Sequence, residues 1–167
     1  VNTGKTPDVG RKVVVVGGGN SAVDSARCAL RFGAKEVMIL YRRRKDDMPA
    51  LEEEIRAAEE EGIIIKCLAT PVKIEGENGR LKKIICQNMT LGEFDSSGRK
   101  KSVPKTGDEF VLEADQLILA IGQNTDFGFD VKKAGITVSK GGLIEVVKGK
   151  MTETSSPMIF AGGDVVT

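Results

Sequence analysis

Three small residues near the amino end of the chain have the spacing of a dinucleotide-binding turn. Gly17, Gly19 and Ala22 fit the pattern G-x-G-x-x-G/A. In such a turn the first glycine permits a tight bend, and the second lets a pyrophosphate approach the backbone. The helix that follows presents unpaired N–H groups and the positive end of its dipole to the phosphates. We therefore predict that this turn binds a pyrophosphate, together with the residues between its small positions, Gly18, Asn20 and Ser21.

Arginines follow the glycines at the interval where a bound dinucleotide would place its adenosine ribose, ~20 residues further on. An acidic residue there would bind the 2′-hydroxyl of NAD, whereas arginine accommodates the 2′-phosphate of NADP. The acid is missing here, and Tyr41 is followed by Arg42, Arg43 and Arg44. We predict that these four residues contact NADP(H). A solvated strand end remains the alternative interpretation.

The charge balance argues against nucleic acid as the partner of these arginines. The chain has 25 Lys and Arg against 24 Asp and Glu, a formal charge of +1. A nucleic-acid-binding surface needs a basic field, which this balance does not supply.

The chain lacks the side chains that most often carry enzymatic proton transfer or metal binding. It has no histidine, and its three cysteines, Cys28, Cys67 and Cys86, form no C-x-x-C pair. We expect no catalytic residue and no metal site, so that a cofactor must carry any chemistry.

The elements that would position the glycines alternate between strand and helix. We predict buried strands over 13–16, 36–41 and 63–68, and helices over 20–32 and 50–61. Strand, helix, strand, helix, strand in this order is half of a doubly wound parallel sheet.

The hydrophobic period then changes to alternation. Segments 71–77, 81–91 and 109–114 read as antiparallel strands, with a hairpin turn at 77–79 and a long loop over 92–108. We predict an α/β, Rossmann-like three-layer domain with a central parallel sheet and this three-stranded meander as a crossover.

A fourth buried strand over 115–122 would bring its carboxyl end to the ligand. We predict cofactor contacts for the residues there, Ala120, Ile121, Gly122 and Gln123. Beyond it we expect a short strand over 143–147, and another over 157–164 that ends in Gly163 and Asp164.

Length and composition are those of one ordinary globular domain, with 40% hydrophobic and 29% charged residues over 167 positions. No apolar run approaches the ~20 residues of a membrane span, and no secretory signal opens the chain. We therefore expect a cytoplasmic protein without a membrane partner. The nucleotide motif follows a short loop, predicted over 1–11, which suggests a domain excised from a larger protein.

The motifs taken together resemble the glutamate synthase small (β) subunit family of pyridine nucleotide–disulfide oxidoreductase-like flavoproteins. The resemblance rests on the glycine motif from Gly17, on Tyr41 to Arg44, on Met48-Pro49-Ala50, on Ala120 to Gln123 and on the run from Phe160 to Thr167. It covers nearly the whole chain.

This resemblance implies that 1–167 is an NAD(P)H-binding domain inserted into an FAD domain, with 157–167 beginning the return to the flavin side. It implies that Gly19 to Ala22 hold the NADP pyrophosphate, that Arg42 and Arg43 hold the 2′-phosphate, and that Gly163 and Asp164 contact FAD. The implied partners are the FAD domain of the same polypeptide and an iron–sulfur or large catalytic subunit. The chain alone would bind nicotinamide cofactor but not flavin.

The implied activity is positioning of NADPH for hydride transfer to FAD and onward electron transfer. An NADP(H)-binding module that regulates or assembles a partner without turnover is the alternative. A dehydrogenase that acts directly on a small substrate would need a substrate-facing acid or base, and the sequence offers none that is convincing.

Overall fold

The computed structural model describes residues 7–95 and 98–166. Contacts between residues divide the chain into two compact units, Val1–Ile121 and Gly122–Thr167. That 1–167 forms one NAD(P)H-binding domain stays a prediction. Residues 1–6 of the predicted amino-terminal loop, and residue 167, lie outside the described part.

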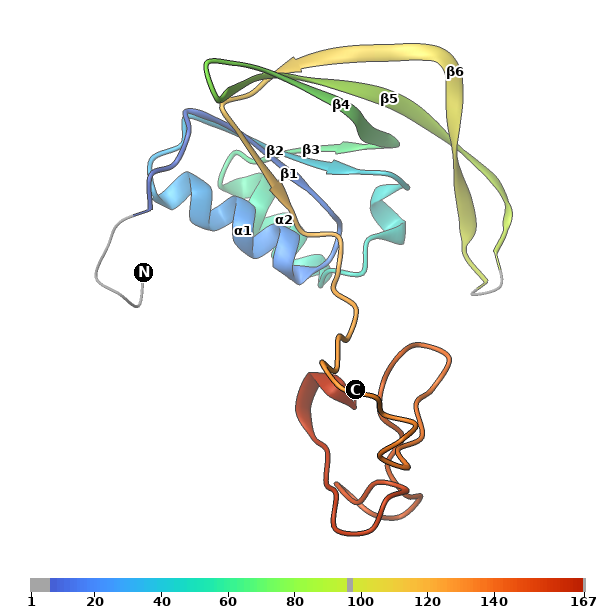
Figure 1. Ribbon diagram of the computed structural model, residues 1–167. Helices are drawn as coiled ribbons and strands as arrows, with labels where there is room; N and C mark the ends of the chain where they lie inside the picture. Colours follow the sequence, from blue (N-terminus) through green and yellow to red (C-terminus); the bar gives the residue numbers. More distant parts are fainter. Residues whose placement is uncertain (1–6, 96–97, 167) are drawn as a thin grey trace. The chain divides into compact units, whose positions relative to one another are not determined.

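A parallel sheet forms the centre of the first unit (Figure 1). Its strands are β1 (Lys12–Val16), β2 (Glu36–Tyr41), β3 (Ile64–Cys67) and β7 (Gln116–Leu119), in the order β3-β2-β1-β7. In a doubly wound sheet the first half has the strand order 3-2-1, and the second half begins with a strand next to strand 1. Here β7 occupies that place, and the order confirms the predicted parallel sheet.

Two helices cover one face of this sheet (Figure 1). They are α1 (Asn20–Arg31) and α2 (Glu52–Glu60). The buried face of α1 consists of small residues that let it approach the strands closely, namely Ala22, Val23, Ala26 and Ala29. Helix α2 begins two residues later than predicted, because Leu51 has an extended backbone, with a ψ of 136°, and forms the N-cap.

An antiparallel sheet covers the opposite face, which makes the predicted third layer (Figure 1). Its strands are β4 (Ala69–Glu77), β5 (Arg80–Phe94) and β6 (Lys100–Glu113), with β5 in the middle. Buried residues from both sheets form its core, including Val14, Leu40, Ile84 and Cys86.

The prediction of a long loop over 92–108 is wrong, because most of this segment extends β5 and β6. Its Gly, Ser and Pro content is tolerated because β6 lies at the edge of the sheet, where Pro104 interrupts no inner ladder. The register between β5 and β6 shifts between Gln87 and Met89 and again between Leu91 and Phe94. Such irregularities bend a strand pair, so the far end of the hairpin can curve out of the sheet.

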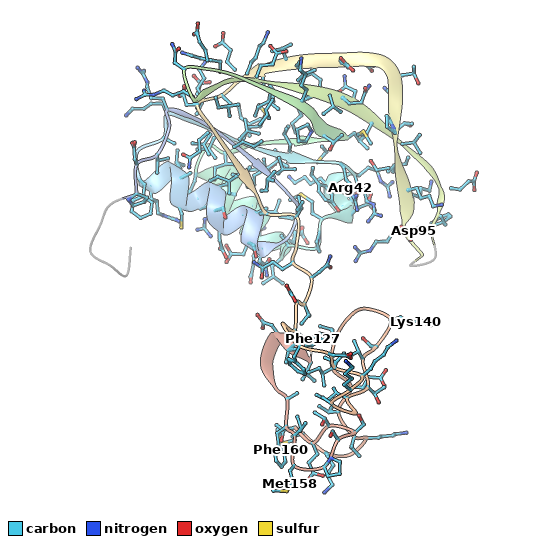
Figure 2. The ribbon with its side chains drawn as sticks, in the orientation of Figure 1. Arg42, Asp95, Phe127, Lys140, Met158 and Phe160 are labelled. Atoms are coloured by element: carbon cyan, nitrogen blue, oxygen red, sulfur yellow. The ribbon has the colours of Figure 1, made fainter. Side chains whose placement is uncertain are left out.

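The second unit contains turns and isolated bridges in place of the strands predicted over 143–147 and 157–164. The bridges pair Val138 with Ile144, Val146 with Thr154, and Glu153 with Phe160, and the described part ends in the 3₁₀ turn Gly163–Val165. Several apolar side chains of this unit are exposed, including those of Met158 and Phe160, which are labelled in Figure 2. No helix of the described residues is long and apolar enough to cross a membrane.

Candidate dinucleotide-binding site

The glycine turn begins where the carboxyl ends of three parallel strands meet. Gly17 has a φ of 150°, and a Cβ built on it would lie closer than 3.0 Å to the carbonyl oxygen of Ala120, just beyond β7. Its N–H donates to the carbonyl of Leu40 in β2, at 3.0 Å. The turn therefore lies at the switch point between β1 and β7, where open α/β sheets bind ligands.

Gly18 is required by packing within the protein. A Cβ at this position would lie within 3.0 Å of ring atoms of Tyr41. The Tyr41 hydroxyl donates to the carbonyl of Asp47 at 2.6 Å, which fixes the ring in place. Burial raises the pKa of Tyr41, although the nearby charge and hydrogen bond of Arg43 oppose the shift.

Gly19 differs from its two neighbours, because nothing in the described structure requires a glycine there. Its φ is −89°, a value open to any residue, and the nearest atom to a built Cβ is Pro49 Cγ at 3.9 Å. No hydrogen bond of the described residues uses the N–H groups of Gly18, Gly19, Asn20 and Ser21, whereas the N–H of Ala22 donates to the carbonyl of Gly19 at 2.9 Å. The turn therefore has free N–H donors at Gly19 and at the start of α1.

The other predicted residues of the turn, Asn20, Ser21 and Ala22, differ in their contacts and exposure. The side-chain oxygen of Asn20 accepts the N–H of Leu51 at 3.0 Å and so holds the start of α2. Ser21 is exposed at the first turn of α1, while Ala22 is fully buried against the strands.

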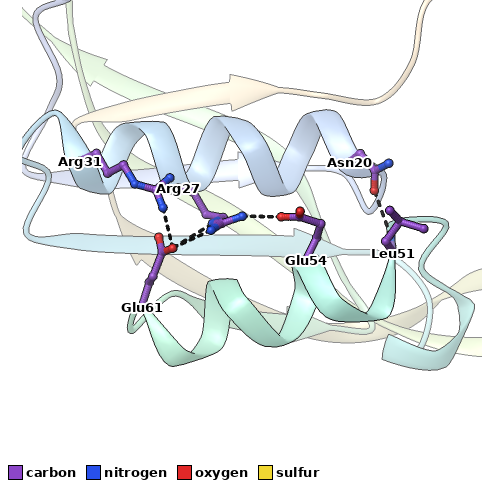
Figure 3. A network of polar contacts seen from close by, with 6 residues as sticks. All are labelled: Asn20, Arg27, Arg31, Leu51, Glu54 and Glu61. Carbon is purple, nitrogen blue, oxygen red and sulfur yellow. Dashed lines mark hydrogen bonds and ion pairs between the residues drawn. The ribbon is translucent and has the colours of Figure 1, made fainter.

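A polar network keeps α1 and α2 together beneath the turn (Figure 3). Arg27 of α1 donates to Glu61 at 2.8 and 3.0 Å and also pairs with Glu54. Arg31 adds a bond of 2.6 Å to the same Glu61 oxygen. The Asn20–Leu51 hydrogen bond connects the amino-terminal ends of the same two helices, so polar contacts join α1 and α2 at both ends.

The three predicted arginines occupy three different environments. Arg42 is exposed, and its guanidinium makes no ion pair with any described residue. Arg43 is buried and donates to Asp95 at 3.0 Å, while its Nε is buried without a partner among the described residues. Arg44 is paired with Asp47 at 3.1 Å, and this bond lowers the pKa of the Asp47 carboxyl.

Two residues at this site were missed by the sequence analysis, which assigned both to a loop. Asp95 binds Arg43 from the end of β5, 52 residues away in the chain. The Ser102 hydroxyl, from β6, donates to the carbonyl of Arg42 at 2.5 Å. No local pattern could have identified them, because both contacts depend on how the β5–β6 hairpin bends toward β2.

The remaining predicted residues are divided between the two units. Ala120 lies against Gly17, and Ile121 is exposed at the end of the first unit. Gly122 and Gln123 are exposed residues of the second unit, as are Gly163, with a φ of 74°, and Asp164. Each stays a predicted contact.

A hollow of about 210 Å³ lies at the other end of the parallel strands. Its lining includes Lys12, Glu36, Ile64 and Glu113, which stand at or near the amino ends of β1, β2 and β3 and the end of β6. Ligands of open α/β sheets lie beyond the carboxyl ends, so this hollow does not belong to the candidate site.

The strand order and the glycine turn at the switch point together define a dinucleotide-binding domain of the Rossmann class. A family model described as pyridine nucleotide-disulphide oxidoreductase matches residues 1–167. The chain belongs to this family.

Curated relatives include several oxidoreductase subunits. The chain is 46% identical over 167 residues to the NADP(+)-dependent formate dehydrogenase subunit beta of Moorella thermoacetica, covering 99% of this chain and 23% of that protein. It is 44% identical over 138 residues to the NADPH-Fe(3+) oxidoreductase subunit beta of Geobacter sulfurreducens, covering 82% and 20%. It is 36% identical over 160 residues to the glutamate synthase [NADPH] small chain of Escherichia coli, covering 94% and 34%. The chain thus spans between 20% and 34% of the length of these relatives.

Among solved structures, thioredoxin reductase from Lactococcus lactis superposes with a TM-score of 0.72 at 29% identity, over 95% of this chain and 45% of that one. Thioredoxin reductase from T. acidophilum gives 0.71 at 21% identity, over 93% and 44%, which supports the fold alone. These likenesses confirm the predicted fold class, and the family match confirms the resemblance found in the sequence.

Proposed function

We propose that this chain binds NADPH across the carboxyl ends of β1, β2 and β7 and positions it for hydride transfer to FAD. The observation that carries the proposal is Gly19, a glycine that neither backbone conformation nor packing demands. A missing side chain with free N–H donors around it suits the approach of a pyrophosphate.

The residues of the turn bind and orient without moving a proton. The N–H groups of Gly18, Gly19 and the first turn of α1 hold the pyrophosphate, and Ala120 limits the approach from the β7 side. Bound NADPH supplies the hydride, so the protein contributes position and electrostatics. The names of the relatives include NADP(+)-dependent and NADPH-linked activities, which supports this choice of cofactor.

The three arginine environments make Arg42 the strongest candidate for the 2′-phosphate. Arg43 and Arg44 are each engaged by a carboxylate, whereas Arg42 is exposed and unpaired among the described residues. An arginine–phosphate pair is a charge-assisted bond with bidentate geometry.

The test is calorimetric titration of the intact protein with NADPH, NADH, 2′,5′-ADP and 5′-AMP. Arg42→Gln should weaken the two 2′-phosphorylated ligands about tenfold and leave the others nearly unchanged. Arg80→Gln, which removes one exposed positive charge at the start of β5, is the control and should change neither class. Equal losses for all four ligands, or no preference for 2′-phosphorylated ligands in the wild type, would overturn the assignment.

We further propose that FAD is held by flanking polypeptide, with Gly163 and Asp164 of the second unit in contact with it. The exposed apolar side chains of this unit, Met158 and Phe160 among them, are surface that a further part of the protein would cover. An iron–sulfur or large catalytic subunit would then receive the electrons, in keeping with the beta-subunit and small-chain names of the relatives. The absorbance spectrum of the purified intact protein tests this: Asp164→Ala should lower its flavin content, and an intact protein without flavin would overturn it.

A further inference from the structure

The charges around the end of β2 are almost all neutralised. Arg43 is paired with Asp95, Arg44 with Asp47, and Lys45 with Glu59. Within the described part of the chain, two guanidinium groups of this region take part in no ion pair, those of Arg42 and Arg99. The first follows β2, and the second comes from the turn between β5 and β6.

The β5–β6 hairpin is attached to the end of β2 at two successive residues. Ser102 donates to the carbonyl of Arg42, and Asp95 accepts the side chain of Arg43. Figure 2 shows Arg42 and Asp95 on the same side of the first unit. Asp95 and Ser102 of the hairpin therefore lie beside the proposed ribose site.

Asp95 also fixes the start of the returning strand. One of its carboxylate oxygens accepts Arg43, and the other accepts the backbone N–H of Arg99 at 3.1 Å. The backbone of Arg99 and the guanidinium of Arg43 are therefore held by the same carboxylate, directly after the end of β2.

A 2′-phosphate needs more than one exposed arginine. A phosphate monoester carries about −1.5 to −2 charges at neutral pH. A single ion pair at an exposed position contributes little to the binding free energy, whereas two guanidinium groups can bind several phosphate oxygens at once. The first unit offers Arg42 and Arg99 on two elements joined by the Ser102 and Asp95 bonds.

We propose that Arg99 is a specificity-determining residue that binds the 2′-phosphate of NADPH together with Arg42. The antiparallel sheet then contributes to cofactor selection in addition to covering the parallel sheet. This inference rests on the proposed function, because it names a second contact of the same bound nucleotide.

The experiment compares Arg99→Gln with the control Arg80→Gln in the intact protein. Arg80 is an exposed arginine at the opposite end of β5, so both changes remove one positive charge from the same sheet. Affinities for 2′,5′-ADP and 5′-AMP are measured by calorimetry. Arg99→Gln should weaken 2′,5′-ADP about tenfold and 5′-AMP less than about twofold, and Arg80→Gln should change neither.

The possible failures can be told apart. If Arg42→Gln weakens 2′,5′-ADP while Arg99→Gln does not, the inference is overturned and the proposed function stands. If the wild type does not prefer 2′,5′-ADP over 5′-AMP, both are overturned. If Arg99→Gln weakens both ligands equally, the residue acts on the fold and the assignment to the 2′-phosphate is wrong.

Discussion

The ring of Tyr41 rests on the backbone of Gly18, at a distance that leaves no room for a methyl group. This contact couples the end of β2 to the turn after β1, so the proposed ribose and pyrophosphate sites share one packing interaction. Gly18→Ala should therefore destabilise the protein by about 1–3 kcal/mol through overpacking. Urea denaturation checks the value, and an unchanged midpoint would show that the ring can move aside at little cost.

Substitution of the neighbouring Gly19 should affect mainly NADPH binding and have little effect on stability. A methyl group on Gly19 meets nothing closer than 3.9 Å, so Gly19→Ala should cost less than about 1 kcal/mol of stability, mainly through the N-cap position. The same methyl would stand where the pyrophosphate is proposed to approach, and NADPH affinity should fall at least about tenfold. Calorimetric titration measures this, and unchanged affinity would place the phosphates elsewhere.

The three cysteines should differ in reactivity. Burial raises the pKa of Cys86 to about 11 and also raises that of Cys67, whereas Cys28 is exposed. The thiolate is the reactive form, so iodoacetamide at about pH 8 should modify Cys28 first and Cys86 last. Mass spectrometry of peptides from the native protein gives the order, and denatured protein serves as the control. Modification of Cys86 as fast as Cys28 would contradict its burial.

The α1–α2 network should make stability depend on acid pH. Hydrogen bonds from Arg27, with its charge and that of Arg31, hold the pKa of Glu61 below its usual 4.5. The contribution is therefore complete above about pH 4.5 and is lost as the pH falls through the lower folded-state pKa. Glu61→Gln should lower the urea midpoint at pH 7 and have a smaller effect near pH 3. A difference that is the same at both pH values would mean that the carboxylate charge plays no part.

The sequence was most informative where a pattern is local. The valines of β1, the glycines and the small face of α1 lie within one stretch, and each constrains the next through chain geometry alone. The same holds for β2, whose predicted bounds match the structure. The sequence also placed the arginines 42–44 at the end of β2, because their spacing from the glycines reflects the length of one helix and one strand.

Prediction failed where the outcome depends on distant contacts. The three arginines are identical in type and adjacent, yet Asp95 engages one and Asp47 another. The segment over 92–108 has the composition of a loop but gains strand geometry from pairing with β5. The side chain of Asn20 accepts the N–H of Leu51, 31 residues further along the chain, and no local pattern indicates this contact.

The position of β1 in the sheet has a consequence for synthesis of the protein. Lys12 at the start of β1 bonds to Asp115 just before β7, and the two residues are 103 positions apart. A ribosome that adds about 5–20 residues per second needs on the order of 10 s to make that segment. Throughout this time one edge of β1 has no partner strand, and a row of valines beside unpaired backbone groups invites aggregation. The nascent chain is therefore most vulnerable between the emergence of the nucleotide turn and the arrival of β7, a window in which chaperones would have most to protect.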